Sequence, residues 1–448
     1  MIDGHDLPSA AMKGSATAVD TLACLLRGDW RDPGSGVQIK VPHIEVAIER
    51  SLVGAEAELV APLHLGRHIA VVSDTTTREV LGERVESALS RLGPILPVVL
   101  GAQPHADAAT AEALQHASAD ADGLVAVGSG TLNDLCKYAA FKEGKPYAVF
   151  ATAPSMNGYA STNAAITVDG HKQSLPAAAP IGVFVDLAIL SKAPPRMIRA
   201  GIGDSLCRST AQADWLLSHH LLGTPFRVAP FALLAGDEPL WMNEPEALLQ
   251  GDLDAMHALA RTLILSGLGM TICGGSYPAS QGEHLISHYV DMFAPSSRGT
   301  YFHGEQVAVA TLTMARIQDL VLGAGQPQPD TPAMTAAELQ RRLGAEIGAA
   351  CWREFEAKRR AQNANENFNA CIADGWMDVV DDVRRVLIPP EQIRDVLNRA
   401  GCPTTPTEIG LAPEFYADAV RNARYLRNRY TFLDLADDCG VLDSFLAS

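Results

Sequence analysis

The sequence lacks several features that would place it in a specialised class of protein. Its eight cysteines include no Cys-x-x-Cys pair, which argues against a cysteine zinc site or a disulfide framework and for reduced thiols. No segment approaches the roughly 18 apolar residues of a membrane span. The N-terminus carries Asp3 and Asp6 and has no apolar run typical of a secretory signal. We therefore expect a soluble, cytoplasmic protein.

A surplus of positive charge is also missing. The chain has 35 basic and 52 acidic residues and a formal charge of −17, which argues against a nucleic-acid partner or a membrane surface. An anionic substrate stays possible, because a metal ion and a few histidines can outweigh the global field locally. The 448 residues are 47% apolar and 19% charged, which suits a globular protein long enough for two domains.

Short apolar runs alternate with helical patterns between residues 37 and 193. Strands are predicted at residues 68–74, 95–100, 123–127, 147–151 and 181–185, and helices at residues 78–92 and 132–142. This alternation indicates a parallel sheet covered by helices, as in a Rossmann-like α/β domain that binds NAD(P). Residues 1–36 are rich in Gly, Pro and Asp and are predicted to form a loosely structured extension.

After Pro194 and Pro195 the strand pattern ends. Helices are predicted at residues 203–221, 253–273, 283–292, 304–322, 336–363, 390–400 and 413–428, with a loop at residues 325–332. Residues 194–448 are therefore predicted to form an all-helical domain that binds metal and substrate, and we expect a cleft between the two domains.

A glycine turn, Gly128-Ser129-Gly130, follows a predicted strand and opens a helix that continues through Asp134. Glycines let the backbone approach a pyrophosphate, and free N–H groups at a helix start stabilise its charge. The turn is neither a full G-x-G-x-x-G nor a Walker sequence. A plain tight turn is the alternative.

Two further candidates for the nucleotide site lie where predicted strands end. Asp74 could accept hydrogen bonds from an adenosine ribose, although the residues alone favour a helix N-cap before Thr77, and Arg78 nearby leaves NADP possible. The segment from Thr152 to Ser161 lies where doubly wound sheets bind ligands. Its alternative is a polar surface loop.

The metal candidates are Asp204, His284 and His303, each expected at the start of a helix. One carboxylate and two imidazoles can hold a divalent metal while leaving positions open for water or substrate. Each residue also has an ordinary alternative. Asp204 could cap its helix or pair with Arg208, and a single histidine is often structural.

A capping-box pattern of Ser280 and Glu283 predicts that a helix starts just before His284. His284 and His288 are four residues apart and therefore share one face of that helix.

These motifs, together with segments 351–355 (CWREF) and 427–434 (RNRYTFLD), resemble the dehydroquinate synthase-like superfamily, which includes the iron-type alcohol dehydrogenases. Within it, the chain is most similar to bacterial sn-glycerol-1-phosphate dehydrogenases of the AraM type, from about residue 45 to the end. The iron-type alcohol dehydrogenases usually have a fourth ligand histidine where this chain has Arg208. Dehydroquinate synthases have glutamate where it has Asp204.

The resemblance implies roles for particular residues. It implies that Asp204, His284 and His303 bind zinc, nickel or iron, and that these three and His288 are catalytic. The NAD or NADP site would be lined by Asp74, Gly128, Gly130, Thr131, Leu132, Asn133, Asp134, Thr152, Ala153, Pro154, Ser155 and Ser161. The substrate would contact Asn157, Asp204 and His288. Asn157 stands where the family has aspartate, which affects the substrate rather than the fold.

The implied reaction is the NAD(P)H-dependent reduction of dihydroxyacetone phosphate to sn-glycerol 1-phosphate, a step of phospholipid biosynthesis. The metal would act as a Lewis acid, and His288 could relay a proton. The family also implies a homodimer or larger homo-oligomer. Two alternatives stay open: a dehydrogenase of another small polyol, similar to glycerol dehydrogenases and favoured by Asn157, and a non-catalytic nucleotide-binding relative.

Overall fold

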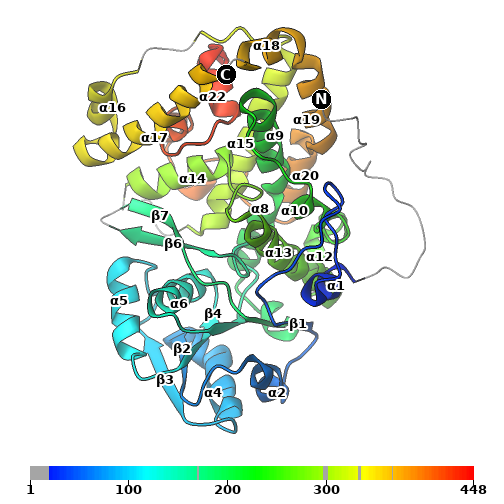
Figure 1. Ribbon diagram of the computed structural model, residues 1–448, viewed down its shortest axis with the longest axis vertical. Helices are drawn as coiled ribbons and strands as arrows, with labels where there is room; N and C mark the ends of the chain where they lie inside the picture. The colour runs from blue at the N-terminus through cyan, green and yellow to red at the C-terminus, as the bar shows by residue number, and fades with distance from the viewer. Residues whose placement is uncertain (1–19, 169–170, 296–300, 331–333, 366, 448) are drawn as a thin grey trace.

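A six-stranded sheet forms one end of the molecule, and helices form the rest (Figure 1). The computed structural model describes residues 20–168, 171–295, 301–330, 334–365 and 367–447. The sheet has the order β1-β8-β5-β4-β2-β3, and every neighbouring pair is parallel. Its strands are β1 (Glu45–Glu49), β2 (Ile69–Asp74), β3 (Ile95–Leu100), β4 (Gly123–Gly128), β5 (Tyr147–Ala151) and β8 (Gly182–Asp186).

The central strands are mostly apolar because helices cover both faces of the sheet. Every residue of β4, β5 and β8 is buried. Val125 and Val127 face a cluster that includes residues of α2 (Glu56–Val60) and α4 (Glu83–Leu89). Leu124 and Ala126 face a second cluster. It includes residues of α5 (Ala108–Ala117), α6 (Gly130–Glu143) and α13 (Leu253–Cys273).

The predicted strands agree with the structure to within a residue, but three strands were not predicted. β1 has glutamate at both ends, and half of the residues in the hairpin of β6 (Asn163–Val168) and β7 (His171–Pro176) are polar. The parallel sheet followed by helices is confirmed, since no described residue after β8 belongs to a strand.

The strand order creates one switch point. The chain runs from β2 to the edge strand β3 and then returns to β4 on the other side of β2. Nucleotides bind outside the carboxyl ends of such a strand pair. Asp74 and Gly128 end these two strands, and Val72 pairs with Ala126 two residues earlier, so the two predicted positions lie at one edge.

The first helix of this part begins earlier than predicted. The helix expected at residues 203–221 is two helices, α8 (Pro195–Leu206) and α9 (Arg208–Leu222). α8 starts at Pro195 because proline is favoured at the first helical position. The helix expected at residues 336–363 is broken at Gly344, which has a φ of 85°. The other long helices are α14 (Gly282–Phe293), α15 (His303–Gly323), α16 (Ala336–Leu343), α17 (Ala345–Ala364), α18 (Asn367–Asp374), α19 (Trp376–Val386), α20 (Pro390–Arg399) and α21 (Pro413–Asn422).

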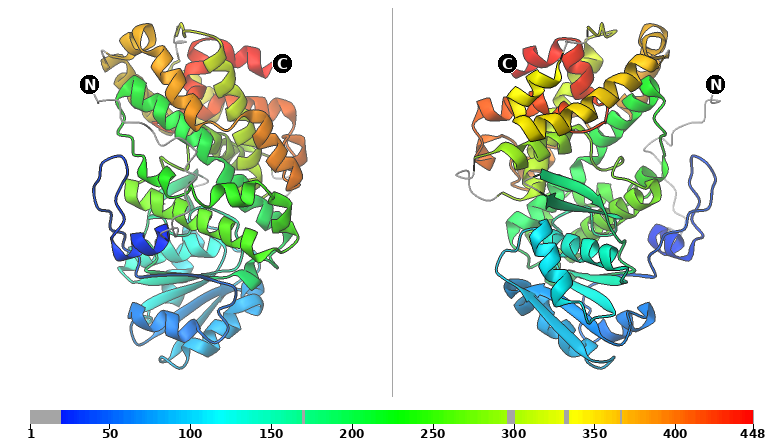
Figure 2. Two further views of the ribbon diagram at one scale, coloured as in Figure 1. Left: turned by 90° about the vertical axis from the view of Figure 1, so that its right-hand side faces the viewer. Right: turned by 60° about the vertical axis from the view of Figure 1, so that its left-hand side comes forward.

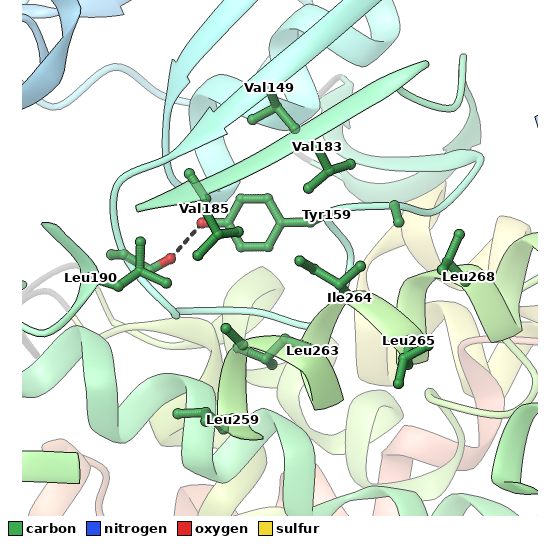
Figure 3. Packing of buried hydrophobic residues seen from close by; sticks show 14 of the residues in the cluster. Val149, Tyr159, Val183, Val185, Leu190, Leu259, Leu263, Ile264, Leu265 and Leu268 are labelled. Carbon is green, nitrogen blue, oxygen red and sulfur yellow. Dashed lines mark hydrogen bonds between the residues drawn. The ribbon is translucent and has the colours of Figure 1, made fainter. Parts of the chain in front are cut away.

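α13 joins the helices to the sheet. By length and composition α13 could cross a membrane, contrary to the expectation that no segment is apolar enough. However, 67% of its most apolar window is buried inside the protein. Figure 3 shows Leu259, Leu263 and Ile264 of this helix packed near Val183 and Val185 of β8. α13 is thus a core helix, and the division into two domains stays a prediction.

The N-terminal extension is more ordered than expected where it is described. Residues 1–19 lie outside the described part, but α1 (Thr21–Arg27) is a helix capped by Asp20. Leu22 and Leu25 of this helix are buried in the main core, and Figure 2 shows α1, in dark blue, beside the green helices. The prediction of a loose lead-in is wrong for this segment.

α8 and α15 cross with no side chain between them. A Cβ on Gly203 would lie 2.2 Å from the carbonyl oxygen of Gly304, and one on Gly304 would lie 1.9 Å from that of Ala200. Only glycine allows backbones to approach so closely. The crossing therefore places residue 204 beside residue 303.

Replacing Gly304 with Ala should separate these helices. We expect Gly304→Ala to lower the free energy of unfolding by at least about 1–3 kcal/mol, the usual cost of overpacking. Gly323→Ala, at the open end of the same helix with no heavy atom within 4 Å of its Cβ, should leave stability unchanged or raise it by up to about 1 kcal/mol. Urea unfolding compares the two variants, and equal stabilities would contradict the crossing.

Candidate active site

Three helices bring the predicted metal ligands together. Asp204 lies in the last turn of α8, His284 in the first turn of α14, and His303 is the first residue of α15. The expectation that Asp204 begins a helix is therefore wrong, because α8 starts at Pro195. The two histidines begin helices as predicted.

The ligand atoms converge on one oxygen. Asp204 Oδ1 lies 3.5 Å from His284 Nε2 and 4.0 Å from His303 Nε2. One ligand atom from each of the three residues lies within 4.8 Å of the others. Asp204 Oδ1 is buried and has no hydrogen-bond partner. A buried carboxylate oxygen without a partner is costly, and a divalent cation between these atoms would satisfy it.

Glu283 orients His284. Its Oε1 lies 2.9 Å from His284 Nδ1, so that nitrogen carries the proton and Nε2 faces Asp204. The same oxygen accepts the backbone N–H of Gln281, and Oε2 accepts the Thr210 hydroxyl at 3.2 Å. The predicted capping box with Ser280 is wrong in detail, because Gln281 is the N-cap and no side chain caps it.

A similar contact orients His303. The Ser287 hydroxyl donates to Gln306 Oε1 at 3.0 Å and lies 3.2 Å from His303 Nδ1. Since this hydroxyl hydrogen is already used, Ser287 accepts from Nδ1–H. The His303 Nε2 is therefore the unprotonated nitrogen, as metal binding requires.

The buried charges shift the pKa values of all three residues. Burial would lower the pKa of His284, but the nearby carboxylates of Asp204 and Glu283 outweigh it and raise the pKa to about 9. Burial and the nearby His284 lower the pKa of His303 to about 4. For Asp204, burial opposes ionisation, yet the nearby imidazoles of His284 and His303 keep the pKa low. Without a metal, this site holds a proton on His284 that a dication would displace.

Asn157 holds Asp204 from the sheet side. Its backbone N–H donates to Asp204 Oδ2 at 2.7 Å, and its side-chain amide donates to the Asp204 carbonyl at 3.2 Å. This leaves Oδ1 as the unused oxygen. Asp204 does not pair with Arg208, which binds Glu238 at 2.6 Å instead.

A buried lysine fixes the loop that carries Asn157. Lys137 of α6 donates to Ser161 Oγ at 2.9 Å, to the Asn163 carbonyl at 3.2 Å and to the Gly158 carbonyl. It lies 3.7 Å from Asp134, and burial lowers its pKa to about 8. Lys137 therefore joins the helix after the glycine turn to the loop beside Asp204.

The predicted nucleotide residues fall into two groups. Gly128, Gly130, Thr131 and Thr152 lie at the switch-point edge, and the Thr152 N–H donates to the Gly128 carbonyl at 3.1 Å. Asp74 caps the next helix by accepting a hydrogen bond from the Thr77 N–H at 2.7 Å. This agrees with the alternative that Asp74 is a helix N-cap.

The second group faces inward. The side chains of Leu132, Asn133, Ala153 and Ser161 are buried, Pro154 packs against α8, and Tyr159 donates to the Ala153 carbonyl, as Figure 3 shows. Asp134 accepts the Ala165 N–H, and Ser155 is half-buried. This group can contribute backbone N–H groups of the first turn of α6, rather than side chains, to a nucleotide.

His288 lies one turn after His284 on α14. Its ring centroid is 6.2 Å from those of both His284 and His303. Its Nδ1 lies 3.4 Å from Arg427 Nη2, and burial together with Arg427 keeps the pKa of His288 well below its usual value. His288 is therefore neutral.

The sequence did not single out Glu283, Ser287, Lys137 or Arg427 as members of the site. Glu283 and Ser287 were close to named histidines, and their positions on the same helix were the available signal. Lys137 and Arg427 bind partners 24 and 139 residues away, so no local spacing could indicate them.

Comparison with known proteins finds dehydrogenases as relatives. A family model described as iron-containing alcohol dehydrogenase matches residues 47–194. Proteins named glycerol-1-phosphate dehydrogenase [NAD(P)+] include one from Bacillus licheniformis, 29% identical over 90% of this chain and 92% of its own length. Another, from Pyrococcus furiosus, is 31% identical over 62% of this chain and 79% of its own length.

Solved structures share the fold. A probable glycerol dehydrogenase from Sinorhizobium meliloti has a TM-score of 0.59 at 19% identity, covering 90% of this chain and 97% of its own. A maleylacetate reductase from Agrobacterium tumefaciens has a TM-score of 0.62 at 15% identity, covering 92% of this chain and 97% of its own.

The role of Glu283 in orienting His284 predicts its effect on metal binding. We expect Glu283→Gln to weaken zinc binding by about 10- to 100-fold, as removal of such outer partners does. Glu112→Gln removes an equal charge at the surface, where Glu112 is 75% exposed, and should leave the affinity unchanged. Competition with a zinc chelator measures both, and equal affinities would show that Glu283 does not support the site.

Proposed function

The chain belongs to the NAD(P)-dependent glycerol-1-phosphate dehydrogenases, and from this membership we propose that it interconverts dihydroxyacetone phosphate and sn-glycerol 1-phosphate. The observation that supports this most directly is the convergence of two imidazole nitrogens on the unpartnered Asp204 Oδ1. A structural zinc site would have four protein ligands, whereas three leave room for a substrate oxygen.

The two cofactors would occupy separate places. Asp204, His284 and His303 would hold zinc, nickel or iron, which when bound would polarise the substrate carbonyl as a Lewis acid. NAD or NADP would lie over the carboxyl ends of β2 and β4, with its pyrophosphate at the first turn of α6.

His288 is the candidate proton donor. Its Nδ1 faces the Arg427 guanidinium, which can only donate, so Nδ1 accepts and Nε2 carries the proton. A neutral imidazole with a hydrogen on Nε2 can donate a hydrogen bond to the oxygen that gains charge as hydride arrives, and it can relay a proton to that oxygen when Nδ1 takes one up from solvent as Nε2 releases one. Asn157 would keep Asp204 in place during this step.

The alternative is a dehydrogenase of another small polyol. The observation that favours it is Asn157, whose amide bonds to Asp204 where the family has aspartate. A non-catalytic relative would have no need for the oriented trio of ligands. We further propose that the enzyme is cytoplasmic and a homodimer or larger, with no nucleic-acid or membrane partner.

An assay of ketone reduction tests the function. Zinc-reconstituted protein should oxidise NADH or NADPH with dihydroxyacetone phosphate, with a kcat/KM at least about 10-fold above that for dihydroxyacetone, a ratio worth about 1.4 kcal/mol. His284→Ala should lose turnover and keep nucleotide binding, because His284 belongs to the predicted metal trio and not to the predicted nucleotide site. NADH fluorescence measures the nucleotide binding. Preference for dihydroxyacetone would support the polyol alternative, and full turnover by His284→Ala would refute the metal role.

A further inference from the structure

Arg427 lies beside the catalytic histidine without a counter-ion. Its Nη2 is 3.4 Å from His288 Nδ1, and no carboxylate of the described residues lies within ion-pair distance of its guanidinium. Glu354 is the one acidic group that stabilises its charge at longer range. Glu354 is exposed and accepts the Asn428 N–H at 3.0 Å, so it does not bond to Arg427.

The surroundings of Arg427 increase its need for an anion. Burial lowers the pKa of Arg427, and Arg429, two residues on, adds a like charge nearby. Arg429 has partners of its own, the Ser280 carbonyl and Ser276 Oγ. A half-buried guanidinium that offers five donors and meets one imidazole nitrogen has several donors left for a ligand.

A second cation approaches the same histidines from the sheet side. Lys172 of β7 lies 3.0 Å from Asp291 of α14, and Figure 1 shows β7 beside that helix. Its charge contributes to the low pKa values of both His288 and His303. Asp291 neutralises this charge, so Arg427 is the cation beside these histidines that has no carboxylate partner among the described residues.

We propose that Arg427 binds the phosphate group of the substrate. This inference rests on the proposed function and names the residue that distinguishes a phosphorylated ketone from its plain counterpart. In dihydroxyacetone phosphate, one methylene and one oxygen separate the phosphorus from the carbonyl carbon. A ketone oxygen at the metal trio thus leaves the phosphate in the neighbourhood of His288. Guanidinium binds phosphate through two parallel hydrogen bonds.

The competing explanation is that Arg427 only orients His288. In that case its loss would impair every substrate equally, since the proton donor serves them all. If Arg427 binds phosphate, its loss would affect only substrates that carry one. The two explanations therefore differ in their effect on dihydroxyacetone, which has the same reacting carbons and no phosphate.

Steady-state kinetics of Arg427→Gln separate these explanations. We expect the KM for dihydroxyacetone phosphate to rise about 10- to 100-fold, as loss of charge-assisted hydrogen bonds does. Because the glutamine amide can still donate to His288 Nδ1, the kcat/KM for dihydroxyacetone should stay within about 3-fold, a difference below 1 kcal/mol. Arg421→Gln, which removes a surface guanidinium paired with Asp418 and Asp443, is the matched control and should change neither value. An equal loss on both substrates would overturn the proposal.

Calorimetry keeps this test independent of turnover. Inorganic phosphate titrated into the NADH complex of the zinc protein should bind Arg427→Gln at least about 10-fold more weakly than wild type, a change of about 1.4 kcal/mol. Arg427→Lys keeps the charge and should fall between the two. Equal affinities in all three proteins would refute phosphate binding by Arg427. If wild type reduces no dihydroxyacetone phosphate yet its phosphate affinity depends on Arg427, the proposed function fails and this inference survives.

Discussion

The contact between the backbones of α8 and α15 is the constraint on which the site depends. Gly203 and Gly304 let the two helices touch, and Asp204 and His303 are the residues that follow and precede them in the chain. Gly201, on another side of α8, meets the Pro154 carbonyl at a distance that leaves no room for a Cβ. Asp204 is thereby held between a helix that carries a histidine and the loop that follows a strand of the sheet.

This arrangement determines the electrostatics of the site. Asn157 binds one oxygen of Asp204, and the other oxygen faces two imidazoles whose outer nitrogens are bonded to Glu283 and Ser287. Each histidine therefore presents the nitrogen that can bind a metal. Helix α14 carries His288 one turn after His284, so the candidate proton donor and one candidate metal ligand are positioned by the same element. Substrate recognition would be completed by the C-terminal segment, which is remote in sequence.

Much of the sheet could be predicted from the sequence because β4, β5 and β8 are buried on both faces and are apolar except for Asp186 at the end of β8. The β6–β7 hairpin could not, since half of its residues are polar. Asp204 is predicted at the start of a helix from residue 203, whereas Pro195 begins α8. The metal trio depends on the resemblance, because Asp204 lies 80 residues before His284 and shares no local pattern with it. Residues that hold the surroundings of the trio in place, such as Lys137, which fixes the loop that carries Asn157, depend on tertiary packing and were not predicted.

Reduction of a ketone should require one divalent metal held by Asp204, His284 and His303. Chelator-treated protein can be titrated with zinc while bound metal and NADH oxidation with dihydroxyacetone phosphate are followed in the same samples. Turnover should rise in proportion to bound zinc and level off at one equivalent, and Asp204→Asn should have neither tight zinc binding nor turnover. Full activity in the metal-free protein, or an Asp204→Asn variant that keeps both, would contradict it.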